Sequence, residues 1–177
     1  PLTFPAGQGI QMEGNSLTYL LLKYITFGQI LPQPPTYGEL SPLLYWVRYF
    51  FTGRPFPFGG LDVMIHPVAW AGWAGLLVTS LNLIPAGQLD GGHIFQLLFG
   101  KKWSRRILPV ILVALAALGF VWSGWWLWAG RVFFVGRIYA EPLDQITPLD
   151  PFRKALGVLA LIIFILTFIP VPLMIIS

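Results

Sequence analysis

The residues best suited to chemistry lie in one segment, which runs from Asn82 to His93 and reads NLIPAGQLDGGH. Asp90 follows a long charge-free apolar run, and an ionised carboxylate within a membrane costs about 2.5–3.5 kcal/mol. Pro85 breaks the hydrogen bonding of a helix, and Gly91 permits backbone conformations that other residues resist. An acid on a broken helix predicts a site that needs a metal, a basic residue or a proton. The alternative is that Asp90 ends the apolar run at a membrane surface.

Composition narrows the class of protein that holds this segment. Of the 177 residues, 56% are hydrophobic and only 10% are charged, whereas a soluble domain carries about 25% charged residues. The mean hydropathy is +0.72, which excludes an ordinary soluble domain and intrinsic disorder. The net charge is +4, but the basic residues are thinly spread, so no nucleic acid is expected as a partner. The absence of cysteine excludes disulfides and thiolate metal ligands.

Three charge-poor runs are long enough to cross a bilayer, which takes about 20 residues. They extend between Asp62 and Asp90, over 107–130 and over 155–177. The first is interrupted near Pro85. We therefore predict an all-α integral membrane protein with about three transmembrane helices, the first of them broken.

The N-terminal third is expected to lie at the membrane surface. Residues 16–31 are apolar but too short to span, and the aromatic residues 43–52 are typical of an interfacial belt. Both predict interfacial or re-entrant helices, and residues 1–15 predict a loop. We divide the chain into an interfacial region, 1–60, and a transmembrane core, 61–177.

Charge in the links predicts the orientation. The short link 101–106 holds Lys101, Lys102, Arg105 and Arg106, whereas the basic residues of the link 131–154 are diluted by acids. The positive-inside rule then makes 101–106 a cytoplasmic loop. The tryptophans within 122–128 predict an interface belt on the opposite side. A bacterial inner or plasma membrane is the expected location.

The NLIPAGQLDGGH string resembles the Asn-x-x-Pro and Leu-Asp-Gly motif of the site-2 protease family of intramembrane zinc metalloproteases. The longer stretch from His66 resembles the bacterial and plastid branch. In that family a His-Glu-x-x-His helix supplies two zinc ligands and a general base, and the aspartate of Leu-Asp-Gly supplies the third ligand. The resemblance therefore implies zinc as the cofactor, with Asp90 as a ligand. The Asn82–Pro85 break would let Asp90 reach a metal held by another helix.

The sequence departs from the family pattern in its histidines. It has only His66 and His93, and neither belongs to a His-Glu-x-x-His motif. No catalytic residue is therefore assigned within 1–177. Because the chain begins at Pro1, we expect the C-terminal part of a larger peptidase domain, inactive by itself. His93 lies three residues after Asp90 and could touch the metal, orient Asp90 or line a polar pocket; we favour the orienting role. His66 is interpreted as structural or interfacial.

The resemblance implies cleavage of membrane-protein substrates, within or near their transmembrane segments, inside a lipid bilayer. Two alternatives remain. One is a noncatalytic homologue that lacks the His-Glu-x-x-His helix at full length. The other is a transporter with a carboxylate at mid-membrane, which an inverted repeat would support; we find none. The sequence predicts no particular oligomeric state.

Overall fold

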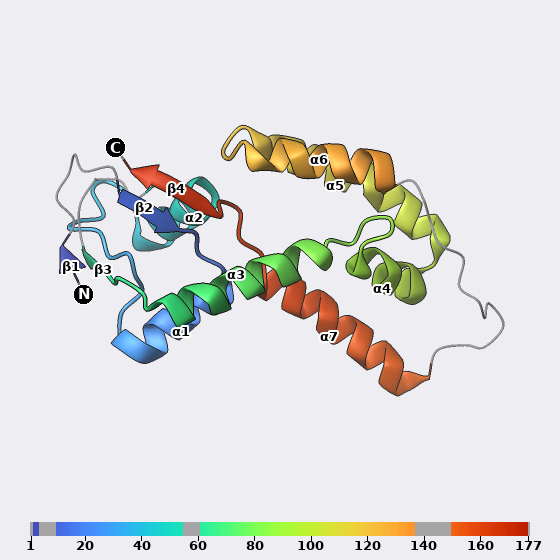
Figure 1. Cartoon of the computed structure of the whole chain (residues 1–177), viewed down its shortest axis with the longest axis horizontal. Coiled ribbons are helices and arrows are strands. Elements are labelled where there is room, and N and C mark those ends of the chain that lie inside the picture. The colour runs from blue at the N-terminus through green and yellow to red at the C-terminus, as the bar shows by residue number, and fades with distance from the viewer. Residues whose placement is uncertain (1, 4–9, 55–60, 137–149, 177) are drawn as a thin grey trace. The chain divides into compact units, whose positions relative to one another are not determined.

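The computed structural model describes residues 2–3, 10–54, 61–136 and 150–176. These residues are mostly helical, which confirms the helical part of the predicted fold class. The helices, labelled in Figure 1, are α1 (Leu17–Phe27), α2 (Pro42–Thr52), α3 (Pro67–Asn82), α4 (Asp90–Phe99), α5 (Lys101–Gly119), α6 (Gly124–Val135) and α7 (Pro151–Thr167). The strands are β1 (Leu2–Thr3), β2 (Ile10–Glu13), β3 (Leu61–Asp62) and β4 (Leu173–Ile176).

The chain forms two compact units. The first comprises Pro1–Leu77 and Thr167–Ser177, and the second comprises Val78–Leu166. The helix α3 belongs to both, since its first part lies in one unit and its last turn in the other.

Two antiparallel strand pairs hold the first unit together. β2 pairs with β4, with Glu13 opposite Leu173, and β1 pairs with β3. The predicted loop over 1–15 is therefore wrong for its described part, because residues 10–13 form a strand; residues 4–9 lie outside the described ranges. The partners are distant in the chain, so no local pattern reveals the pairing.

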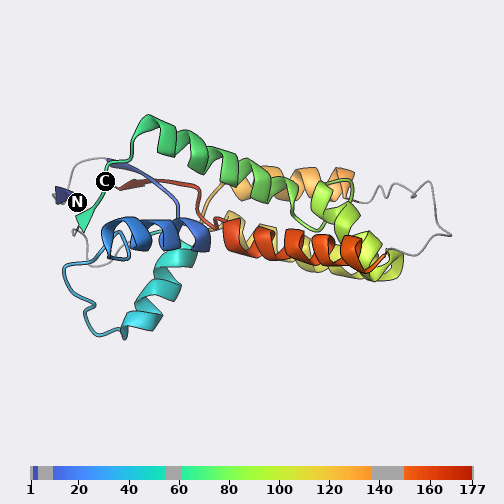
Figure 2. The same cartoon turned by 90° about the horizontal axis from the view of Figure 1, so that it is seen from below.

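A serine caps the start and a glycine caps the end of each of the two N-terminal helices, α1 and α2. The Ser16 hydroxyl accepts a hydrogen bond from the Tyr19 N–H at 3.1 Å at the start of α1, and Ser41 caps α2 in the same way. Each helix ends at a left-handed glycine, Gly28 with φ 70° or Gly53 with φ 66°. α2 lies where the sequence predicts a helix, whereas α1 occupies only the first part of the predicted segment 16–31. Figure 2 shows α2 running away from α1 at a steep angle.

The first predicted span is broken as expected. α3 ends at Asn82, α4 begins at Asp90, and Pro85 lies in the connecting turn. Proline cannot donate a backbone hydrogen bond and clashes with the preceding helical turn. The connecting loop is visible in Figures 1 and 2. The helix break near Pro85 is thus confirmed.

The second predicted span, 107–130, is wrong as a single helix. α5 ends at Gly119 and the chain turns back into α6, which packs against α5. Gly119 permits close packing there, since a Cβ on it would lie 2.6 Å from the Trp126 ring. Trp125 is completely buried, so the predicted interface belt fails for this residue, whereas Trp126 is 47% exposed.

The remaining predicted boundaries also shift. The predicted loop 101–106 is wrong, because these residues form the first turns of α5; Lys and Arg are good helix formers. The third span, 155–177, is also wrong as one helix: α7 ends at Thr167, and a segment with Pro170 leads into β4. The predicted link 131–154 falls largely on 137–149, outside the described residues.

Within the described ranges, no helix combines the length and the apolar character that a membrane crossing requires. The transmembrane part of the predicted fold class is therefore not confirmed. Turns divide or shorten each apolar run, so that α3 has 16 residues and α7 has 17.

Candidate metal ligand and a buried ion cluster

Asp90 is the first residue of α4 and is exposed to solvent. It is the acidic residue of the first turn, where a carboxylate interacts favourably with the unpaired N–H groups and the positive end of the helix dipole. The residue before it, Leu89, provides no side-chain cap. The position therefore leaves the carboxylate oxygens of Asp90 accessible to an external cation.

The structure brings His93 to the same side of α4 as Asp90. The helix begins at Asp90, and the His93 N–H donates to the Leu89 carbonyl at 3.0 Å, so the two side chains are related by one turn. His93 is half-buried. The i, i+3 relation that the sequence required is thus present in the folded chain.

Close backbone contacts in the turn 83–89 set the start of α4. A Cβ at Gly91 would collide with the Leu83 carbonyl oxygen, and Gly87 has φ 52°, in the left-handed region. Ile84 and Ala86 are 2% and 3% exposed and anchor the turn in its unit. Glycine is therefore required at position 91 because the turn and the helix approach closely. This is the packing reason for a residue that the sequence marked as supporting.

Asn82 and Pro85 act on the backbone of the same region. Asn82 is the last residue of α3 and is half-buried, and Pro85 lies within the turn. The Ala86 N–H donates to the Ile84 carbonyl at 2.7 Å across Pro85, which forms a tight local turn. These residues separate the two helices and so allow Asp90 to begin a new one.

The described residues do not complete a zinc site. Among them, no three His, Asp or Glu side chains gather closely enough to hold a metal ion, whereas catalytic zinc takes three protein ligands. Asp90 and His93 fit at most part of such a set. His66 lies in the other unit, immediately before α3, where its Nδ1 accepts the Val68 N–H at 3.2 Å.

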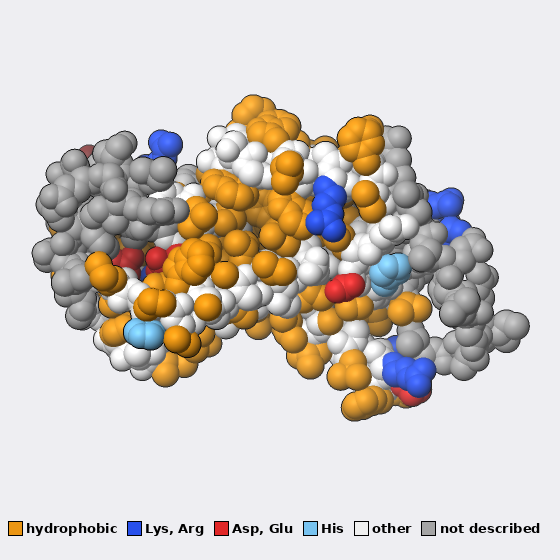
Figure 3. All heavy atoms as spheres, viewed as in Figure 1, with side chains coloured by type: hydrophobic (Ala, Val, Ile, Leu, Met, Phe, Trp, Pro, Cys, Tyr) orange, Lys and Arg blue, Asp and Glu red, His pale blue; other side chains and the backbone are white. Residues whose placement is uncertain are grey.

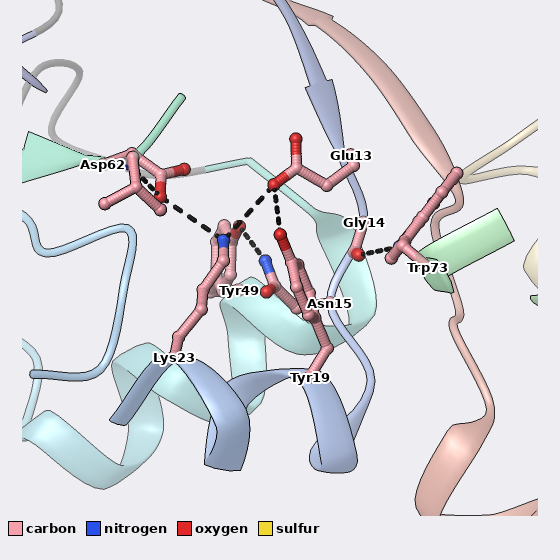
Figure 4. A network of polar contacts seen from close by, with 9 residues as sticks. Glu13, Gly14, Asn15, Tyr19, Lys23, Tyr49, Asp62 and Trp73 are labelled. Atoms are coloured by element: carbon pink, nitrogen blue, oxygen red, sulfur yellow. Dashed lines mark hydrogen bonds and ion pairs between the residues drawn. The ribbon is translucent and has the colours of Figure 1, made fainter. Parts of the chain in front are cut away.

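A second cluster of ionisable groups lies in the first unit and was missed by sequence reasoning (Figure 4). The Lys23 ammonium is 3.3 Å from Asp62 Oδ1 and 3.5 Å from Glu13 Oε1, and Lys23 is only 3% exposed. The Tyr19 hydroxyl donates to Glu13 Oε1 at 2.8 Å. The cluster joins α1 to β2 and β3. A lone lysine in an apolar helix is the sequence signal that predicts such a partner.

Three further side chains extend this cluster to α2 and α3. The Asn15 amide Nδ2 donates to the Tyr49 hydroxyl at 2.9 Å, and the Trp73 Nε1 donates to the Gly14 carbonyl at 2.8 Å, both seen in Figure 4. Two buried atoms, Asn15 Oδ1 and the Tyr45 hydroxyl oxygen, have no hydrogen-bond partner within the described structure.

Burial is the largest cause of the raised pKa values in and beside this cluster. Desolvation raises the pKa of Asp62, although the nearby Lys23 ammonium acts in the opposite direction. Burial and then the Glu13 carboxylate raise the pKa of Tyr19, and burial raises the pKa of Tyr45 to about 12. These groups hold the unit together, and none of them belongs to the predicted metal site.

Comparison with known proteins identifies the relatives of this chain. Residues 60–122, which include Asp90, match the family model "Peptidase family M50". "Probable zinc metallopeptidase EGY3, chloroplastic" from Arabidopsis thaliana is 35% identical over 150 residues, which is 77% of this chain and 26% of that protein. "Probable zinc metalloprotease EGY2, chloroplastic" from Oryza sativa subsp. indica is 33% identical over 169 residues, 91% of this chain and 30% of that protein.

A third relative, "Probable zinc metalloprotease EGY1, chloroplastic" from Arabidopsis thaliana, is 38% identical over 112 residues, 62% of this chain and 20% of that protein. The chain thus spans no more than 30% of the length of these relatives. No solved structure matches the chain at a significant level. The names of the relatives imply zinc as their metal.

The predicted bacterial inner membrane is wrong, because these relatives are chloroplastic proteins. The charge of the loops predicts which side of a membrane each loop faces, but it does not identify the membrane. The resemblance to the site-2 protease family, in contrast, is confirmed. Residues 60–122 thus match Peptidase family M50 (site-2 protease), and the chain is homologous to probable zinc metalloproteases of plastids.

Proposed function

We propose that this chain supplies one ligand, Asp90, to the zinc centre of a membrane-bound metalloprotease of the M50 family. The observation that carries the proposal is the position of Asp90: an exposed carboxylate on the first turn of α4, directly after a helix break, within the stretch that matches the family. An acid so placed is free to turn toward a cation without the cost of breaking a buried ion pair.

The neighbours of Asp90 have supporting roles in this proposal. His93 lies one turn further along α4, where it can orient the Asp90 carboxylate. Gly91 lets the turn 83–89 approach the helix, and Asn82 and Pro85 end α3 before it. The other two zinc ligands and the general base must come from residues outside the described set. We therefore expect this chain to be inactive by itself.

We further propose that the substrates are membrane proteins, cut within or near their transmembrane segments, and that the site of action is a plastid membrane. Apolar side chains cover much of the face shown in Figure 3, and Leu43, Phe120 and Phe152 are each more than two-thirds exposed. A surface so rich in exposed apolar residues favours a lipid or apolar protein environment. The chloroplastic names of the relatives support the plastid location.

A chimera tests the zinc proposal. The 177-residue chain replaces the matching segment of the rice relative, and the purified protein is assayed for bound zinc and for cleavage of a membrane-protein substrate. We expect Asp90→Asn to abolish cleavage and to lower zinc affinity. The His93→Gln variant should lower zinc affinity about 10- to 100-fold, as is typical for residues that orient a ligand.

Asp150→Asn is the matched control, because Asp150 is an exposed acid directly before another helix, α7. It should leave zinc content and cleavage unchanged. If the Asp90→Asn chimera keeps both its zinc and its activity, Asp90 is not a ligand and the proposal fails.

A further inference from the structure

The helix α5 begins with an unusual concentration of positive charge. Lys101, Lys102, Arg105 and Arg106 are all exposed within its first two turns, its N-cap is Gly100 without a side-chain hydrogen bond, and its first turn contains no acid. The N-terminus of a helix already carries a partial positive charge, so cations there are unfavourable. An anion bound at this end would therefore offset both the repulsion among the cations and their repulsion from the positive end of the helix dipole.

The exposed face of α5 changes in character along its axis. Lys102 and Arg106 lie one turn apart, and the same face continues with Val110 and Val113, which are 63% and 70% exposed. Trp103 is 58% exposed, with the Arg106 guanidinium 5.6 Å from its ring centroid. The order along the helix is cationic, aromatic and then apolar.

The opposite face of α5 is the one that packs within its unit. Ser104, Leu108 and Leu115 are 4%, 8% and 3% exposed. The cationic and apolar face is therefore the outward one. From Arg106 to Val113 the helix advances roughly 10 Å along its axis. This advance is less than the thickness of one leaflet of a bilayer.

The helix α7 offers an internal comparison, since it too begins with cations, Arg153 and Lys154. There, however, Asp150 supplies an anion: its Oδ1 accepts the Arg153 N–H at 2.7 Å, and its Oδ2 lies 3.7 Å from Arg153 Nε. The chain thus compensates the N-terminal charge of α7 with its own acid. The first turn of α5 contains no such acid.

We propose that the outward face of α5 docks on a lipid surface that contains anionic phospholipid headgroups. Lys102 and Arg106 bind the phosphate oxygens, Trp103 lies at the boundary, and Val110 and Val113 contact the acyl chains. Along this face the side chains change from cationic to aromatic to apolar, and a phospholipid changes in the same order from its anionic headgroup to its hydrocarbon chains. A nucleic acid would match the cations but not the apolar residues that follow them. The proposal rests on α5 alone and is independent of the zinc ligand.

Lipid titration tests this inference on the 177-residue chain in a neutral detergent. Phosphatidylglycerol or phosphatidylcholine is added, and native mass spectrometry measures the affinity for each. We expect tighter binding of phosphatidylglycerol. The double variant Lys102→Gln/Arg106→Gln should weaken phosphatidylglycerol binding roughly 25-fold, at about fivefold for each cation, and leave phosphatidylcholine binding unchanged.

The matched control is Arg153→Gln/Lys154→Gln, which removes the same charge from the start of α7 and should change neither affinity. Equal weakening by both double variants, or no weakening by the α5 variant, overturns the proposal. Inorganic phosphate should displace phosphatidylglycerol no better than chloride at equal ionic strength; stronger displacement would indicate a site for free phosphate and also overturns it.

Two further measurements guard against misfolding of the variants: one is made on the variants themselves and the other on the unaltered chain. Circular dichroism checks their helix content, and the salt dependence of lipid binding needs no variant. Rising sodium chloride should weaken the binding of phosphatidylglycerol but not that of phosphatidylcholine. If both lipids respond equally to salt, the preference does not come from the charges of α5 and the inference is wrong.

Discussion

Asp62 and Asp90 are the same residue type in two contrasting environments. Asp62 is 2% exposed and lies 3.3 Å from the ammonium of Lys23, which is 39 residues away in the chain. Asp90 is exposed on the first turn of α4, and the residues that place it there are all close in sequence. The comparison shows that a buried acid is committed to its ion pair, whereas an exposed acid at a helix start is available to an external ligand.

The largest difference in stability between the two regions should come from substitution of Lys23. Lys23→Met removes the only cation that pairs with Glu13 and Asp62 in the described structure. The loss of one partner from a buried ion pair costs about 3–5 kcal/mol, since the remaining charge stays buried. Denaturant unfolding in detergent measures this cost. Asp90→Asn should lower the free energy of unfolding by no more than about 1 kcal/mol, the contribution of a carboxylate at a helix start; equal costs would abolish the contrast.

A smaller effect should distinguish two helical glycines. Gly91→Ala forces a Cβ against the Leu83 carbonyl, whereas a Cβ on Gly75 in α3 meets nothing within 4 Å. We expect Gly91→Ala to destabilise the chain by about 1–3 kcal/mol through overpacking. Gly75→Ala should stabilise it by about 0.5–1 kcal/mol, because alanine is the better helix former.

The same unfolding experiment measures both glycine variants, and zinc binding by the chimera adds a second measurement for Gly91→Ala. A stable Gly91→Ala variant that binds zinc normally would show that the turn 83–89 does not require close approach to α4.

The last comparison concerns two tyrosines that flank the buried cluster. The Tyr49 hydroxyl accepts a hydrogen bond from Asn15 Nδ2, whereas the buried Tyr45 hydroxyl has no partner within the described structure. Tyr49→Phe leaves the Asn15 donor unpaired and should cost about 1–3 kcal/mol. Tyr45→Phe removes an unsatisfied polar atom and should be neutral or slightly stabilising. Comparison of the two unfolding midpoints provides the test, and a reversed order would refute this account of the cluster.

The local features of the chain could be predicted from its residues. Pro85 and the glycines around it predicted the break between α3 and α4, and serine and glycine mark both ends of α1 and α2. The NLIPAGQLDGGH string indicated the family that the comparisons then confirmed. Each of these signals acts through hydrogen bonds and dihedral angles within a few residues, so it is visible in the sequence alone.

The predicted spans failed because hydropathy measures apolar content and is blind to chain reversal. The run 107–130 is uniformly apolar, yet the chain reverses between Gly119 and Gly124 so that α6 packs against α5. Likewise, the apolar end of the chain becomes β4 only because β2 is present to pair with it.

The sequence by itself determined the helix break, the candidate ligand Asp90 and the family, because these depend on short-range geometry and on a contiguous motif. Tertiary structure alone decided that Lys23 pairs with Asp62 and Glu13, that β2 pairs with β4, and that the cations of α5 face outward. These arrangements join residues far apart in the chain or on opposite faces of one helix. They depend on how the whole chain buries its apolar surface.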